Sequence, residues 1–218
     1  MLPGRGELAQ RAFPAVVAVL SAGCIGSFLY ALTLDSAELV SWFERWGLVP
    51  REFLRGAGGQ HDTRQVPWAT PVSAMFLHGN ALHLLGNLVY LWIFGSALES
   101  ALGRLRFGLF FGACGLAAAL AQVASDPTAW SPVVGMSGAV SGLVAGYAIS
   151  HGRAPLQLRW PAVRVPALGL MLVWVAIALL AGLSAAGGIA SWAHLGGFAV
   201  GAVLIRPLWG TPPAEAGP

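Results

Sequence analysis

The sequence predicts an all-α membrane protein: a bundle of six transmembrane helices with a long, membrane-associated first outside loop. The first reason is composition, since 56% of the 218 residues are hydrophobic and only 10% are charged, whereas a soluble domain is typically about 25% charged. The second reason is a series of apolar stretches long enough to cross a bilayer. The expected spans are residues 13–34, 79–98, 105–124, 136–151, 166–183 and 189–205.

The spans are expected to form one domain, residues 13–206, between a short cytoplasmic leader (1–12) and a Pro-rich cytoplasmic tail (207–218). The first apolar run has no clear small-residue cleavage site, so it is interpreted as a span and not as a signal peptide. The connection 35–70 carries Trp and aliphatic residues at roughly helical spacing among charges. This pattern predicts an amphipathic segment in the membrane surface, with a small extramembrane helix pair as the alternative.

The fourth span is short. At 1.5 Å per residue it reaches only about 24 Å, less than the roughly 30 Å hydrocarbon core. Its first residue of interest, Ser137, is therefore expected below the membrane surface. The approach 130–134 must then dip into the membrane, which is allowed only where it is buried in protein or faces a wet cavity.

The distribution of arginine sets the orientation. All twelve basic residues are Arg. With both termini inside, eight Arg face three acids on the inner side, against four Arg and six acids outside, as the positive-inside rule requires. We therefore expect a multi-pass protein of the cell inner membrane with cytoplasmic termini. The Arg residues form no basic patch, which excludes nucleic acid as a partner, and the cysteines lie in apolar runs, so no thiolate metal site is expected.

This orientation brings four polar residues to one depth. His83 and Asn87 lie in the first turns of the second span, Ser137 opens the fourth and His194 lies about one turn into the sixth. All four are expected in the outer part of the membrane. Polar side chains at such depth usually face the bundle interior or a wet cavity.

Glycine spacing predicts which helices meet. The fourth and sixth spans each carry small residues four apart, which allow two helices to approach closely. The residues are Gly138 and Gly142 on the fourth span and Gly197 and Gly201 on the sixth. Their packing would bring Ser137 against His194, the geometry of a serine with its general base.

If Ser137 and His194 carry out acyl transfer, His83 and Asn87 are candidates for stabilising its intermediate. The oxyanion of a tetrahedral intermediate needs hydrogen-bond donors, and the Ser137 backbone N–H, the Asn87 amide and a His83 ring N–H are the candidates. No acid lies at this depth to orient His194, so a Ser–His dyad is expected and not a triad. No cofactor and no metal are expected.

Three stretches in order resemble the rhomboid family of intramembrane serine proteases. They are residues 76–87 (FLHGNALHLLGN), 135–138 (GMSG) and 193–198 (AHLGGF). The resemblance covers about residues 13–206 and makes the expected bundle a rhomboid-like one.

The resemblance implies that Ser137 is the nucleophile, that His194 is the base, and that His83 and Asn87 help to form the oxyanion hole. It also implies two supporting residues: His78 for the first connection and Glu99 as a structural acid at the inner end of the second span. The implied partners are the lipid bilayer and a transmembrane protein substrate, cut within or near a helix-destabilised segment. No oligomeric state is predicted.

One position departs from the family. Four residues after the nucleophile, many relatives carry an aromatic side chain that stacks on the catalytic histidine, and here Ser141 stands there. Either Ser141 forms a hydrogen bond near His194 or another residue supplies the packing. Two functions compete with a general protease: an inactive relative that binds transmembrane helices, and a specialised sorting protease that removes C-terminal anchors. A channel is disfavoured because the inner halves of the spans are nearly all apolar.

Overall fold

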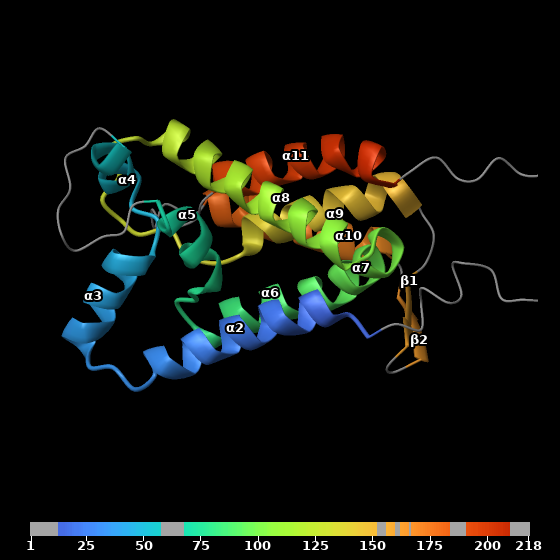
Figure 1. The fold of residues 1–218 in the computed structure, drawn as a ribbon, viewed down its shortest axis with the longest axis horizontal. Coiled ribbons are helices and arrows are strands. Elements are labelled where there is room, and N and C mark those ends of the chain that lie inside the picture. The colour runs from blue at the N-terminus through green and yellow to red at the C-terminus, as the bar shows by residue number, and fades with distance from the viewer. Residues whose placement is uncertain are drawn as a thin grey trace, which may run out of the picture.

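Helices occupy all six apolar ranges in the computed structural model, which describes residues 13–57, 68–151, 156–159, 162–165, 167–183 and 191–209 (Figure 1). Within these residues, Ala81–Leu102 and Arg104–Ser125 are long and apolar enough to cross a membrane. The helices are α2 (Ala15–Ala31), α6 (Ala81–Tyr90) continued by the π-helical turn η2 (Leu91–Gly95) and α7 (Ser96–Leu102), α8 (Arg104–Ser125), α9 (Ser137–His151), α10 (Ala167–Leu183) and α11 (Ser191–Trp209).

One helix end differs from the sequence expectation. Helix α11 runs to Trp209 with Pro207 inside it, four residues beyond the expected end of the sixth span at residue 205. A proline near a helix end removes a single backbone donor, and Arg206 in the last turn complements the helix dipole, so the helix passes this point. The leader 1–12 and the rest of the tail lie outside the described residues.

A small hairpin, which the sequence analysis did not predict, accompanies the helical bundle. Strands β1 (Leu156–Arg159) and β2 (Ala162–Val165) pair antiparallel, with Leu156 opposite Val165 and Arg159 opposite Ala162. The apolar–polar alternation of residues 156–159 is the period-two signal of a strand. The hairpin lies at the end of the bundle away from the helices of the first connection (Figure 1).

The first connection forms short helices. They are α3 (Ser36–Trp46), α4 (Pro50–Ala57), α5 (Thr70–Ser73) and the 3₁₀ turn η1 (Ala74–Phe76). Asp35 and Glu38 close a capping box at the start of α3, which satisfies backbone donors that the first turn leaves free. The α3 helix has no buried residue, and its contact with a membrane surface stays a prediction.

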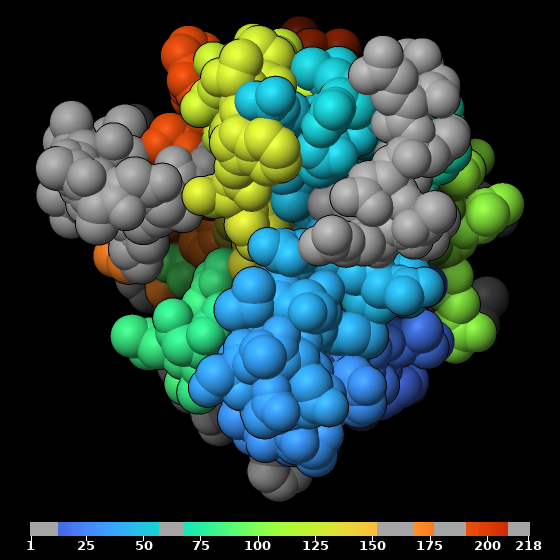
Figure 2. Space-filling view, turned by 90° about the vertical axis from the view of Figure 1, so that its left-hand side faces the viewer, coloured from blue at the N-terminus to red at the C-terminus, as the bar shows by residue number. Residues whose placement is uncertain are grey.

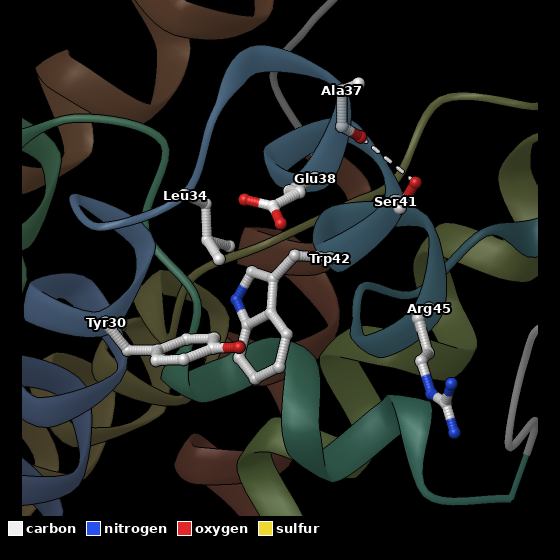
Figure 3. A pocket seen from close by; sticks show the side chains of 7 residues that line it. All are labelled: Tyr30, Leu34, Ala37, Glu38, Ser41, Trp42 and Arg45. Atoms are coloured by element: carbon white, nitrogen blue, oxygen red, sulfur yellow. Dashed lines mark hydrogen bonds between the residues drawn. The ribbon is translucent and has the colours of Figure 1, made fainter.

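An open hollow of about 420 Å³ lies between the end of α2 and the face of α3 (Figure 3). Tyr30 and Trp42 line it, with their ring centroids 4.8 Å apart. It includes neither Ser137 nor His194.

Glu99, in the C-terminal part of the second apolar range, links this range to the first helix. Its carboxylate accepts hydrogen bonds from the backbone N–H groups of Val16 (3.0 Å) and Val17 (2.9 Å). These donors belong to the first turn of α2, which has no side-chain cap of its own. A buried carboxylate at a helix N-terminus is favoured by the dipole as well as by these bonds.

Helix α9 is the centre of the bundle. Every residue from Gly138 to Tyr147 is buried, as expected for a helix that is apolar all round. It packs against both α8 and α11, which also contact each other, and α10 and η2 touch it as well. The first residue of this central helix is Ser137.

Candidate active site

Backbone hydrogen bonds to the first connection hold the segment that leads into Ser137. Leu48 and Val133 exchange backbone hydrogen bonds of 3.0 and 2.8 Å, and Gly135 N–H donates to the Ala74 carbonyl at 2.8 Å. Figure 2, which faces this end of the bundle, shows the yellow approach segment beside the cyan α4. The protein therefore satisfies backbone groups that would be costly if left unpaired inside a membrane.

Gly135 brings this segment against the polar face of α6. Its φ is +104°, a conformation that residues with a Cβ rarely adopt. A Cβ at this position would lie 2.7 Å from the His83 ring and 3.6 Å from Asn87 Nδ2. Only glycine therefore allows the chain to pass this close to both side chains just before Ser137.

The glycines of α9 and α11 face each other, as their spacing predicted. A Cβ at Gly197 would collide with the Gly138 carbonyl oxygen, and one at Gly201 would collide with the Gly142 backbone. A Cβ at Gly138 would also meet Ala118 of α8. The two helices are therefore in backbone contact, which requires small residues at these positions.

This contact sets the distance between the two central polar side chains. His194 Nε2 lies 2.8 Å from Ser137 Oγ. Among the residues that the structure describes, none forms a hydrogen bond with the buried His194 Nδ1. A serine hydroxyl hydrogen-bonded to an imidazole nitrogen is the arrangement of a base-activated nucleophile, here with no carboxylate partner among the described side chains.

Asn87 is the buried amide of the site, only 2% exposed. Its Nδ2 donates to the His83 carbonyl at 3.1 Å, and its Oδ1 has no partner among the described groups. An amide carries two N–H bonds, so one donor is left for a second acceptor beside Gly135.

His78 lies nearer to the site than its expected role in the first connection implied. It is 2% exposed, and its ring centroid lies 5.1 Å from that of His83 in an edge-to-face arrangement. Its Nδ1 lies 3.4 Å from the Phe76 carbonyl. Burial, with a smaller contribution from His83, lowers the pKa of His78 from 6.5 to about 4, so the ring is neutral at pH 7 and packs behind His83.

Sequence reasoning did not identify Trp174 of α10. Its indole Nε1 donates to Ser141 Oγ at 2.9 Å, and its ring lies edge-to-face with the His194 ring at a centroid distance of 6.2 Å. Trp174 is only 7% exposed, so it packs inside the bundle. Its place in the middle of an apolar run, away from either end, was the available signal.

The comparisons with known proteins decide the family. Residues 66–210, well over half of the chain, match the model of the Rhomboid domain. This stretch contains His83, Asn87, Ser137 and His194.

The chain belongs to the rhomboid family.

Similar rhomboid proteins come from plants, fungi and bacteria. RHOMBOID-like protein 5 of Arabidopsis thaliana is 31% identical over 144 residues, which is 64% of this chain and 45% of that protein. Rhomboid-type serine protease 2 of Emericella nidulans is 29% identical over 67% of this chain and 28% of its own length. Rhomboid protease AarA of Providencia stuartii is 27% identical over 63% of this chain and 54% of its own. The chain thus spans about half or less of these rhomboid proteins. The family, together with the two apolar helices, indicates a membrane protein.

Proposed function

We propose that this rhomboid protein is an intramembrane serine endopeptidase that uses Ser137 and His194 as a dyad. The observation that carries the proposal is the 2.8 Å contact between Ser137 Oγ and His194 Nε2, held by backbone packing of α9 on α11. The names of two similar proteins, a rhomboid-type serine protease and a rhomboid protease, support the same activity.

The first half of the reaction forms an acyl-enzyme. His194 Nε2 takes the Ser137 hydroxyl proton while Oγ attacks the carbonyl carbon of the scissile peptide bond. The resulting oxyanion is stabilised by the Ser137 backbone N–H at the start of α9, by the free Asn87 N–H and by a His83 ring N–H. The C–N bond then breaks, and the leaving amine takes the proton from His194.

The second half restores the enzyme. Water, deprotonated by His194, attacks the ester carbonyl, and Ser137 Oγ leaves with the proton that returns from His194. Water is proposed to reach the site from the outer side, where the short fourth span begins. In this arrangement the protein lies in the inner membrane as six spans, with both termini cytoplasmic and the site open to the outside.

The proposed substrates are membrane-anchored proteins with a helix-destabilised transmembrane segment. A peptide bond inside a regular helix has its carbonyl in a hydrogen bond and its backbone enclosed by side chains, so local unwinding is needed before Ser137 reaches it. The bilayer is therefore part of the reaction environment as well as the solvent of the protein.

The experiment is cleavage of a model transmembrane substrate by the purified protein in detergent, combined with labelling by a fluorophosphonate probe. The probe reacts with an activated serine, forming an O–P bond and releasing fluoride. We expect the wild type to cut and to label, and Ser137→Ala and His194→Ala to do neither while keeping the thermal stability of the wild type. A folded wild type that neither cuts nor labels would favour the inactive, helix-binding alternative.

A further inference from the structure

Trp174 is the aromatic side chain by which α10 reaches the dyad. Along α10, Leu172 and Val173 are exposed, whereas Trp174 is 7% exposed and turned into the bundle. Its indole contacts residues of three other helices: Tyr90 at the end of α6, Ser141 of α9 and His194 of α11.

The indole is fixed from two sides. Its N–H donates to Ser141 Oγ at 2.9 Å, and the Tyr90 ring packs on it with centroids 4.5 Å apart. Tyr90 is itself tied to α10, because its hydroxyl donates to the Leu170 carbonyl at 3.0 Å. The ring that meets His194 therefore has little freedom to rotate.

Ser141 links this ring to the nucleophile. It is 1% exposed, and its hydroxyl donates to the Ser137 carbonyl at 2.9 Å while accepting from Trp174. A chain of hydrogen bonds thus runs from the indole to the backbone of Ser137. The indole N–H of Trp174 is thus fixed relative to the nucleophile Ser137, and its ring contacts the base His194.

His194 needs such a constraint. Its Nδ1 has no hydrogen-bond partner among the described residues, and in a triad that nitrogen is the one an acid would hold. Besides the bond to Ser137, the orientation of the imidazole therefore rests on packing, and the indole supplies an edge-to-face contact at an interplanar angle of 77°.

We propose that Trp174, anchored by Ser141, is a positioning residue that holds the His194 imidazole in line with Ser137. The proposal rests on the proposed function and gives the Ser–His pair the orienting element that it lacks. A tryptophan that only fills space would leave the rate of the chemical step unchanged once folding is preserved.

The test compares Trp174→Phe, Ser141→Ala and the double variant with wild type. For each we would measure kcat, KM, the rate of fluorophosphonate labelling and the unfolding temperature in detergent. Each single variant should lower kcat and the labelling rate roughly five- to tenfold, the size of one lost hydrogen bond, with KM little changed. The double variant should be no worse than the poorer single variant, because both changes remove the same interaction.

Two further variants bracket the expected effect on kcat and on the labelling rate. Trp174→Leu removes the ring and should lower kcat by roughly 100-fold, since a displacement of about 1 Å at reacting groups has an effect of that size. Trp92→Phe makes the same chemical change as Trp174→Phe at a residue that is 40% exposed, and it should leave both rates unchanged.

Three results would overturn the positioning role while leaving the protease proposal intact: unchanged labelling rates, losses fully explained by a lower unfolding temperature, or additive effects in the double variant. A wild type that neither cuts nor labels would remove the protease proposal first and the positioning role with it.

Discussion

At the scale of single residues, the polar groups of the site are held by contacts that leave specific atoms available. Asn87 has one N–H in a bond to the His83 carbonyl, and its buried position beside Gly135 places the other N–H near the start of α9. The amide is thereby oriented before any substrate arrives, which is the condition for strong stabilisation of a developing oxyanion.

Asn87→Ala is expected to lower kcat by roughly 100- to 1,000-fold with KM little changed, because loss of one oxyanion donor has an effect of that order. Steady-state cleavage of the model substrate measures both parameters. Leu85→Ala on the same helix, where the side chain is exposed, is the matched control and should behave as wild type. A kcat for Asn87→Ala close to that of wild type would exclude the amide from the oxyanion hole.

His78 is expected to make stability depend on pH. The pKa of its folded state is about 4, whereas the ordinary value is 6.5, so the unfolded chain binds a proton that the folded chain excludes. Its contribution to stability is therefore complete above pH 6.5 and is lost as the pH falls toward 4. Unfolding temperatures in detergent between pH 7.5 and 4.5 should fall less steeply for His78→Gln than for wild type. Equal slopes for the two proteins would show that His78 does not carry this effect.

At the scale of elements, backbone contact between α9 and α11 determines the site. The glycine faces allow an approach at which a single methyl group would overlap a carbonyl oxygen. Packed interiors do not absorb such additions without displacement. Because Ser137 and His194 lie on opposite sides of this contact, any separation of the helices lengthens the hydrogen bond between them.

Gly197→Ala should therefore lower both stability and activity. Overpacking of this kind typically costs about 1–3 kcal/mol, and the displaced helix should reduce kcat by roughly 100-fold. Gly112→Ala is the control, since a Cβ there meets nothing within 4 Å and alanine is the better helix former. Unfolding temperature and cleavage rate measure the two effects. If Gly197→Ala matched Gly112→Ala in both, the close packing of α9 on α11 would not be required.

At the scale of the whole molecule, the structure gathers the start of α6, α9 and α11 at the end that also carries α3 and α4 (Figure 1). The hairpin lies at the other end. The distribution of arginine along the chain predicts that the termini and the hairpin end lie inside, so we predict that the site opens to the outside.

Single-cysteine labelling tests this orientation. Ser125→Cys, at the exposed end of α8, should react in intact cells with a membrane-impermeant maleimide, whereas Ala101→Cys, exposed at the opposite end, should react only after lysis. The native Cys24 and Cys114 are 1% and 0% exposed, so they should stay unlabelled in both conditions. The reverse pattern would place the termini outside.

The sequence by itself determined the helical ranges and the glycine faces, because these follow from apolar run length and four-residue spacing. From the position of each residue along its span, it also predicted a common membrane depth for His83, Asn87, Ser137 and His194. It also indicated the family, through three motifs in order. Only the tertiary structure decided three contacts. Gly135 lies against the His83 ring, Leu48 forms backbone hydrogen bonds with the segment before Ser137, and Trp174 supplies the aromatic contact to His194. Those contacts join residues far apart along the chain, and their existence depends on how the helices pack, which local spacing does not encode.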